Sequence, residues 1–217
     1  MYKILNYDII RNRLEKGLIK PEWCSVKDLT KDDLCLFKIP NYEVDDSNIS
    51  NDDCYIYGLI LGDGCMMPSS TNCYLSLHKE NKKHIIDFVK KYLDNKCIEN
   101  RCVDEENTTR VYWKRNIQLV FRHCDIYDKN KEKHITPKWL NLPLEKIKYI
   151  VKGLIDTDGC KGNELLFDTT SHNLVETLRY LLLRMGIPTS GYSRDRRGES
   201  HISMYGDRIE NKKISYT

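Results

Sequence analysis

The protein has 217 residues, of which 40% are hydrophobic and 31% are charged, a composition that can bury a core and is not that of a disordered chain. No apolar run approaches the ~18–20 residues of a membrane span, and the N-terminus MYKILNYDII lacks the design of a signal peptide. The net charge of +3 divides into −3 over residues 1–53 and +6 over residues 54–217. We therefore expect an intracellular protein, cytoplasmic or nuclear. The basic body is compatible with a nucleic-acid partner, and an ordinary solvated surface is the alternative explanation of the charge asymmetry.

The first predicted element is an acidic segment, residues 1–50. Its apolar residues predict a small strand-rich layer formed by Trp23, Val26, Leu29, Leu34, Leu36, Phe37 and Ile39. Two roles stay open for the segment: a layer that docks on the core, or an arm that contacts DNA. Its negative charge argues against the arm.

A nine-residue pattern occurs twice, 95 residues apart, as YGLILGDGC at 57–65 and KGLIDTDGC at 152–160. Such internal similarity indicates a duplicated unit. Each copy follows a helix-compatible run and precedes a strand and then an amphipathic helix. These flanking runs are 53–57, 74–78 and 82–94 in the first copy, and 144–151, 165–170 and 172–185 in the second.

Strand patterns come next in both halves. Residues 110–122 alternate about a turn at 114–116, and two short strands are predicted at 191–196 and 201–205, joined by 197–199. The chain is thus predicted to be an α+β protein with two similar units about a pseudo-two-fold axis. The predicted domains are 1–50, 51–143 and 144–217.

Small residues recur one helical turn apart within each copy of the pattern. They predict a close helix–helix interface, formed by Gly58, Gly62, Gly153 and Thr157. Each helix then ends at Asp-Gly, so Asp63 and Asp158 should emerge together. Either aspartate alone would be an ordinary helix-end residue. Two carboxylates held together repel unless cations lie between them, and oxygen ligands of this kind suit Mg²⁺.

The two copies, IYGLILGDG at 56–64 and VKGLIDTDG at 151–159, resemble the paired LAGLIDADG motifs of homing endonucleases. In that family the last acid before the final glycine is the essential carboxylate. The resemblance therefore implies that Asp63 and Asp158 are catalytic and hold the metal, together with the preceding Gly62 and Thr157. It also implies Mg²⁺ as cofactor, with Mn²⁺ as a substitute.

The fold that this resemblance implies consists of duplicated αββαββ(α) units whose two curved antiparallel sheets saddle double-stranded DNA. A single chain with two motifs would act as a monomer. Alternating positions on the expected strands point Val111, Trp113, Ile117, Leu119 and Phe121 toward the core. The DNA-facing candidates are Tyr112, Lys114, Gln118 and Arg122 in the first half, and Arg194, Arg196, His201 and Ser203 in the second. Any solvated sheet edge carries similar residues, so each assignment has an ordinary alternative.

The family often places a lysine beside each catalytic aspartate. The resemblance implies Lys133 for the first, with Lys138 as the alternative, and Lys213 for the second, with Lys212 as the alternative. For each of them a solvated surface lysine is the ordinary alternative.

The resemblance extends to endonucleases encoded within inteins. Residues 133–143 and 170–190 are similar to segments that flank the second motif there, and residues 18–40 resemble the end of a splicing domain. Self-splicing is not expected, because no nucleophilic Cys or Ser opens the chain and no His-Asn pair closes it.

The predicted function is site-specific, Mg²⁺-dependent hydrolysis of both strands of a long asymmetric DNA target. The alternative on the same fold is a catalytically silent DNA-binding protein or an RNA maturase. An unrelated α+β interaction module is a third possibility. Two matched aspartates favour cutting, because a protein that only binds has no need of the pair.

Overall fold

The computed structural model of the protein describes residues 7–31, 33, 39–67, 72–114, 118–161, 165–202 and 208–217. The chain divides into two compact units, Met1–Ile39 and Pro40–Thr217. This division falls after Ile39, whereas the sequence predicts a boundary at residue 50. Among the described residues, no helix has the length and apolar character needed to cross a membrane.

The N-terminal unit contains a short helix, α1 (Tyr7–Glu15), and a single turn of 3-10 helix, η1 (Val26–Asp28). The expected strand-rich layer is not seen in the described part of this unit. Its backbone hydrogen bonds there are local, such as the one from Leu18 N to Arg13 O at 2.9 Å, and the Trp23 side chain is fully exposed. Such hydrogen bonds join residues that are close in sequence, and so they do not build a β-ladder between two strands. Leu34, Leu36 and Phe37, which we assigned to the layer, lie outside the described residues.

The second unit begins with the first motif helix, α2 (Asn51–Asp63). The Ser50 hydroxyl accepts a hydrogen bond from Asp53 N at 3.2 Å, and Ser50 N donates to the Asp53 carboxylate at 2.8 Å. This capping box fixes the start of the helix. Residues 53–61 are all buried, so α2 is the central helix of the unit.

The first half contains a four-stranded antiparallel sheet in the order β1-β2-β4-β3. Alternation sorts its residues between two faces. Leu75 pairs with Val111 on the buried face, whereas Tyr74 pairs with Tyr112 on the outer face. The amphipathic helix α3 (Lys83–Asn95) contacts strands of this sheet. The strands are β1 (Gly64–Met66), β2 (Asn72–His78), β3 (Asn100–Asp104) and β4 (Thr108–Lys114).

The hairpin that we predicted over residues 110–122 is wrong in its second arm. The neighbours of β4 are β2 and β3, and residues 118–122 form a loop. Leu119 and Phe121 are nevertheless buried, and the Phe121 ring lies 6.0 Å from that of Tyr57 on α2. The alternate residues Leu119 and Phe121 are therefore buried because this loop packs on a helix, and not because the stretch pairs as a strand. Ile117 lies outside the described residues.

Two short helical elements, α4 (His123–Ile126) and α5 (Pro137–Leu140), link the halves, and the second half begins with the second motif helix, α6 (Leu144–Asp158). A short ladder of β5 (Gly159–Lys161) and β6 (Leu165–Phe167) leads to α7 (His172–Arg184). The remaining strands are β7 (Ser193–Arg194), β8 (Ser200–Ile202), β9 (Arg208–Glu210) and β10 (Ser215–Tyr216).

The last strands pair differently from our prediction. We expected 191–196 and 201–205 to form one hairpin, but β7 pairs with β10 and β8 pairs with β9. The C-terminal residues 208–216, which we did not assign to strands, supply both partners. Among the described residues, the second half therefore shows three two-stranded ladders in place of one four-stranded sheet.

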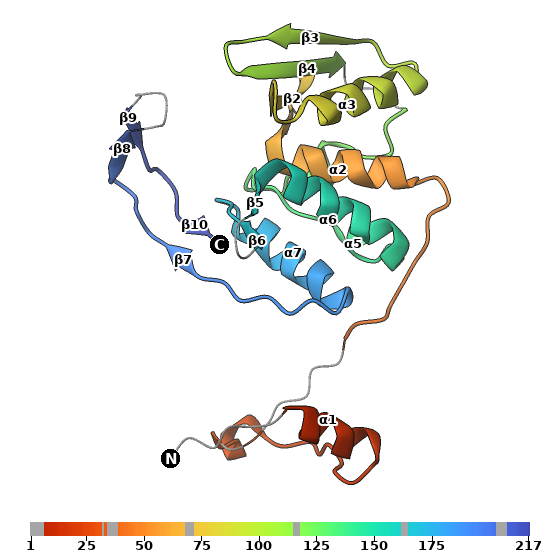
Figure 1. The fold of residues 1–217 in the computed structure, drawn as a ribbon, viewed down its shortest axis with the longest axis vertical. Coiled ribbons are helices and arrows are strands. Elements are labelled where there is room, and N and C mark those ends of the chain that lie inside the picture. Colours follow the sequence, from red (N-terminus) through yellow and green to blue (C-terminus); the bar gives the residue numbers. More distant parts are fainter. Residues whose placement is uncertain are drawn as a thin grey trace. The chain divides into compact units, whose positions relative to one another are not determined.

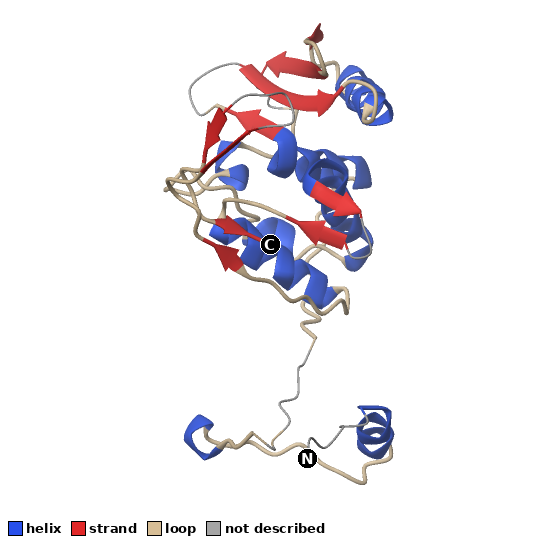
Figure 2. Ribbon diagram, turned by 60° about the vertical axis from the view of Figure 1, so that its left-hand side comes forward, coloured by secondary structure: helices blue, strands red, loops and turns tan. Residues whose placement is uncertain are grey.

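The two motif helices form the centre of the unit. Figure 1 shows α2 (orange) directly beside α6 (teal), with the first sheet above and α7 below, and Figure 2 keeps this vertical order from another side. The core includes a stacked pair of rings, Tyr57 and Trp139, whose centroids are 4.0 Å apart. The Tyr57 hydroxyl donates to Asp125 O at 2.6 Å, which ties α2 to the link between the halves.

An acidic strap, residues 41–46, precedes α2 and contacts the second half. Val44 N donates to Asn141 O at 2.8 Å. The Lys146 ammonium donates to Asp45 at 2.5 Å, and the buried Arg184 lies 3.4 Å from Glu43. The acidic side chains of the strap therefore form ion pairs with basic residues of the second half.

Candidate active site and nucleic-acid interface

The close approach of α2 and α6 depends on glycine at two positions. A Cβ added to Gly58 would collide with the carbonyl oxygen of Ile150, and one added to Gly153 would lie 2.5 Å from that of Tyr55. The two contacts are reciprocal, because Tyr55 and Gly58 precede Ile150 and Gly153 by the same 95 residues. A side chain at either position would therefore force the two helices apart.

The same crossing continues at Gly62 and Thr157. A Cβ on Gly62 would overlap the Thr157 hydroxyl, so only glycine fits there. The Thr157 hydroxyl donates back to Gly153 O at 3.0 Å and to Leu154 O at 2.8 Å. The backbone carbonyls of Gly62 and Thr157 are therefore brought to the end of the helix pair, beside the two aspartates.

Asp63 and Asp158 interact at this end of the interface. Burial, and then the negative charge of Asp63, raise the pKa of Asp158 to about 6, and a hydrogen bond between the two carboxyl groups acts in the same direction. Two nearby carboxylates and two backbone carbonyls form a set of hard oxygen donors, which is the chemistry that a Mg²⁺-type ion prefers. The residues present therefore fit a divalent metal.

Lys133 lies beside this pair. Its ammonium donates to Gly62 O, and its own carbonyl accepts from the Ser171 hydroxyl at 2.6 Å. Burial lowers the pKa of Lys133, while the charges of Asp158 and Asp63 act in the opposite direction.

Lys82, which we did not predict, is the second lysine at the site. Its ammonium donates to Asp63 at 2.9 Å and to Thr157 O at 2.6 Å. Lys82 is the N-cap residue of α3 and makes no capping hydrogen bond, whereas the N-cap of α7 is Ser171, which does. A lysine at a helix N-terminus opposes the helix dipole. The difference between Lys82 and Ser171 at the two helix starts could therefore have indicated from sequence that Lys82 has a role other than capping.

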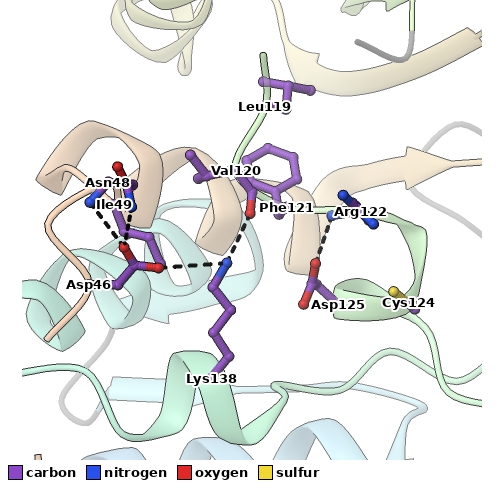
Figure 3. A pocket seen from close by; sticks show the side chains of 10 residues that line it. All are labelled: Asp46, Asn48, Ile49, Leu119, Val120, Phe121, Arg122, Cys124, Asp125 and Lys138. Atoms are coloured by element: carbon purple, nitrogen blue, oxygen red, sulfur yellow. Dashed lines mark hydrogen bonds and ion pairs between the residues drawn. The ribbon is translucent and has the colours of Figure 1, made fainter. Parts of the chain in front are cut away.

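The other predicted lysines lie at different places. Lys213 lines a cavity of about 460 Å³ together with Lys133 and Asp158. Lys212 lines a separate cavity beside Arg196. Lys138 is also elsewhere, because its ammonium lies 3.3 Å from Val120 O and 4.0 Å from Asp46, in the pocket that Figure 3 shows. The geometry thus favours Lys133 over Lys138.

The outer face of the first sheet carries aromatic and cationic side chains together. The rings of Tyr74 and Tyr112 are 5.6 Å apart. The Arg101 guanidinium lies 5.1 Å from the Tyr112 ring, and that of Arg110 lies 5.9 Å from the Tyr74 ring. Lys114 is exposed on the same strand and pairs with Glu99. Of this group we predicted only Tyr112 and Lys114. Arg101 was missed because it lies on β3, which we did not predict, whereas Tyr74 and Arg110 lie on predicted strands and were not assigned to the DNA-facing side.

The remaining DNA-facing candidates are scattered. Gln118 and Arg122 are exposed but belong to the loop after β4, so our placement of them on a strand is wrong. Arg194 lies in β7 against the Tyr192 ring, and Arg196 is exposed just beyond it. His201 lies in β8, where only its backbone is described. Ser203 lies outside the described residues.

A family model for the LAGLIDADG-like domain matches residues 145–215. The match covers about a third of the chain. The matched segment contains all of α6 except its first residue, and it includes Asp158, one of the two carboxylates described above.

Solved structures of homing endonuclease I-DmoI share the fold. A mesophilic variant of I-DmoI matches with a TM-score of 0.53 at 13% identity, over 78% of this chain and 89% of that one. I-DmoI in complex with DNA and Ca matches with a TM-score of 0.51 at 14% identity, over 78% and 83% of the two chains. The match extends well beyond the LAGLIDADG-like domain and so includes elements of the first half.

Two curated proteins are related in sequence. The ATP-dependent DNA helicase Hel308 of Methanocaldococcus jannaschii is 27% identical over 150 residues, which is 67% of this chain. The ribonucleoside-diphosphate reductase NrdEB subunit alpha of Bacillus subtilis is 26% identical over 170 residues, or 68% of the chain. The chain spans only 12% and 16% of the lengths of these relatives.

Proposed function

We propose that the protein is a site-specific DNA endonuclease that hydrolyses phosphodiester bonds in both strands of a long asymmetric target with Mg²⁺. The observation that carries this proposal is the meeting of Asp63 and Asp158 at the end of the paired helices. Structures of I-DmoI bound to its target DNA, solved with Mn or with Mg, have the same fold. They support DNA as the partner and divalent metal as the cofactor.

The oxygens that would hold metal ions are the carboxylates of Asp63 and Asp158 and the carbonyls of Gly62 and Thr157. Bound divalent metal supplies an activated water and neutralises the charge that develops on the phosphate. The ammonium groups of Lys82 and Lys133 would stabilise the same developing charge from opposite sides. Lys213 lines the neighbouring cavity, and we assign it the same charge-stabilising role in the cleavage of the second DNA strand.

DNA would lie along the outer face of the first sheet and along the strands that follow α7. Arginines stacked on aromatic rings present both charge and donors to phosphates and base edges. On the first sheet we assign this role to Tyr112 and Lys114, joined by Arg101 and Arg110. In the second half the assignment is Arg194, Arg196, His201 and Ser203. Gln118 and Arg122 would contact DNA from a loop.

We infer that the chain derives from an intein-encoded endonuclease and acts as a monomer inside the cell. The segment 18–40 resembles the end of a splicing domain. In addition, two proteins of unrelated activity, a helicase and a reductase subunit, each share a short part of their length with this chain. An element inserted into different host proteins would produce such matches.

The experiment is a selection of cleaved sites from a randomised duplex library by the wild-type protein in Mg²⁺. The proposal predicts a long asymmetric site that is cut in both strands, with no cutting when the metal is chelated. Recovery of bound but uncut sites under all metal conditions would favour the silent DNA-binding alternative. Binding of RNA with no selected DNA site would favour the maturase.

A further inference from the structure

The two lysines at the site are arranged reciprocally. Lys82 joins the Asp63 carboxylate of α2 to Thr157 O of α6. Lys133 donates to Gly62 O of α2, and its charge is attracted by the Asp158 carboxylate of α6. Each ammonium therefore donates to the carbonyl that precedes one aspartate. Lys82 also contacts the carboxylate of the other aspartate, whereas Lys133 acts on Asp158 through its charge alone.

The backbones of both lysines are held in place, which leaves the long side chains as the movable parts. Lys82 N donates to His78 O at 3.0 Å at the start of α3. Lys133 is paired with Tyr127 in an isolated bridge, and its carbonyl accepts from Ser171. Four methylene groups separate each ammonium from its backbone, so the charge can shift by several ångströms without any change in fold.

The oxygens that these ammonium groups contact are the oxygens that would bind metal. A divalent ion cannot share them with the lysines, because both cations would occupy the same space and repel one another. DNA phosphates are strong acceptors for an ammonium group, so arriving DNA offers each lysine a replacement partner.

We propose that Lys82 and Lys133 act as internal cations that hold the two aspartates in the DNA-free protein and pass to the DNA phosphates on binding, so that the divalent metal binds well only after DNA has bound. This inference rests on the proposed function and adds a coupling between its two ligands. Because coupling free energies are reciprocal, the metal must also strengthen DNA binding.

The first experiment measures Mn²⁺ binding to the DNA-free, full-length protein by electron paramagnetic resonance. Lys82→Met removes the ammonium and keeps the bulk of the stem, and we expect it to bind Mn²⁺ about tenfold more tightly than wild type, a change of ~1.4 kcal/mol. The matched control is Lys83→Met. Lys83 is the adjacent lysine, with the same charge, and it pairs with the exposed Asp87 at 3.0 Å. The control should bind Mn²⁺ as wild type does.

The second experiment measures the coupling itself. The affinity for the duplex selected above is followed by fluorescence anisotropy with and without Ca²⁺, which occupies oxygen sites of the same kind. Wild type should bind the duplex more tightly with Ca²⁺, and Lys82→Met should lose most of that gain. Thermal unfolding of each variant checks that it is folded.

Two outcomes separate this inference from the proposed function. If Asp63→Asn abolishes Mn²⁺ binding while Lys82→Met and wild type bind Mn²⁺ equally, the metal site stands and the internal-cation role is wrong. If Mn²⁺ binding survives in both Asp63→Asn and Asp158→Asn, the metal assignment of the proposed function is itself overturned.

Discussion

At the scale of single residues, Asp53 and Asp158 show two different surroundings of a buried carboxyl group. Asp53 is 1% exposed, and its carboxylate accepts hydrogen bonds from Ser50, from Tyr92 at 2.6 Å and from Lys96 at 2.9 Å. Asp158 is in the opposite situation, because burial and the neighbouring Asp63 carboxylate both disfavour its charged form. The first arrangement stabilises the fold, and the second stores repulsion at the site that would bind metal.

The Asp53 cluster gives a prediction for stability. Burial alone would raise the pKa of Asp53, but the hydrogen bonds from Ser50, Tyr92 and Lys96 outweigh it and hold the pKa below its usual value. Asp53→Asn should lower the free energy of unfolding by about 3 kcal/mol at pH 7, because Lys96 loses its partner and the capping box is broken. Denaturant titration measures the change.

The sign of the pH dependence follows from the lowered pKa. Stability from a carboxyl group of this kind is present above its unfolded pKa of ~3.9 and is lost as pH falls through the lower folded value. The difference between wild type and Asp53→Asn should therefore shrink below about pH 4. A difference that grew in acid would contradict the assignment.

At the scale of elements, the helix pair is the feature that holds the site together. Tyr55 on α2 donates to Asp156 on α6 at 2.8 Å, and Asp156 also pairs with Lys152 of its own helix. The positions that correspond to Tyr55 and Asp156 in the other copy are Ile150 and Leu61, both fully buried. The absent acid at Leu61 is thus replaced by apolar packing in the first copy.

Gly58→Ala tests the close approach directly. The added methyl group meets the backbone of Ile150, which cannot rotate away, so the helices must separate. We expect the free energy of unfolding to fall by about 2–3 kcal/mol. An alanine at exposed Lys148 of α6 is the control and should change stability by less than ~0.5 kcal/mol. Equal stability of Gly58→Ala and wild type would mean that the helices do not cross at this point.

The two motif helices and the amphipathic helices α3 and α7 could be predicted from sequence, whereas α1, α4 and α5 were not predicted and the strand pairing was predicted only in part. Helix α2 is specified by local signals, Ser50 at its start and Gly64 after its end. Pairing of β4 with β3 or of β7 with β10 depends on contacts between distant segments, for which the alternation of residues 110–122 gave no partner. Lys82 stands at the start of the helix predicted over 82–94, which was a usable signal, but its contact with Asp63 forms only in the folded chain.

At the scale of the whole molecule, the acidic and basic side chains that make up the net charge of +3 lie in different places. The acidic strap lies against the second half through Lys146 and Arg184. The exposed Arg101 and the half-buried Arg110, which pairs with Glu105 at 3.2 Å, lie on the outer face of the first sheet. A modest net charge is therefore compatible with a surface that attracts DNA.

Salt dependence tests that surface. DNA affinity should fall linearly on a log–log plot against salt concentration, and Arg101→Ala combined with Arg110→Ala should reduce the slope by about 2. Exposed Arg179, which pairs with Glu176 on α7, provides the matched control, and Arg179→Ala should leave the slope unchanged. An equal slope for wild type and the double variant would exclude this face as the DNA surface.

The central claim is that Asp63 and Asp158 together cut DNA. The most direct measurement is the rate of Mg²⁺-dependent cleavage of each strand of the selected duplex by wild type, Asp63→Asn and Asp158→Asn, at equal amounts of bound DNA. We expect that both variants bind the duplex and that neither makes the double-strand break. Cleavage of both strands at the wild-type rate by either variant would contradict it.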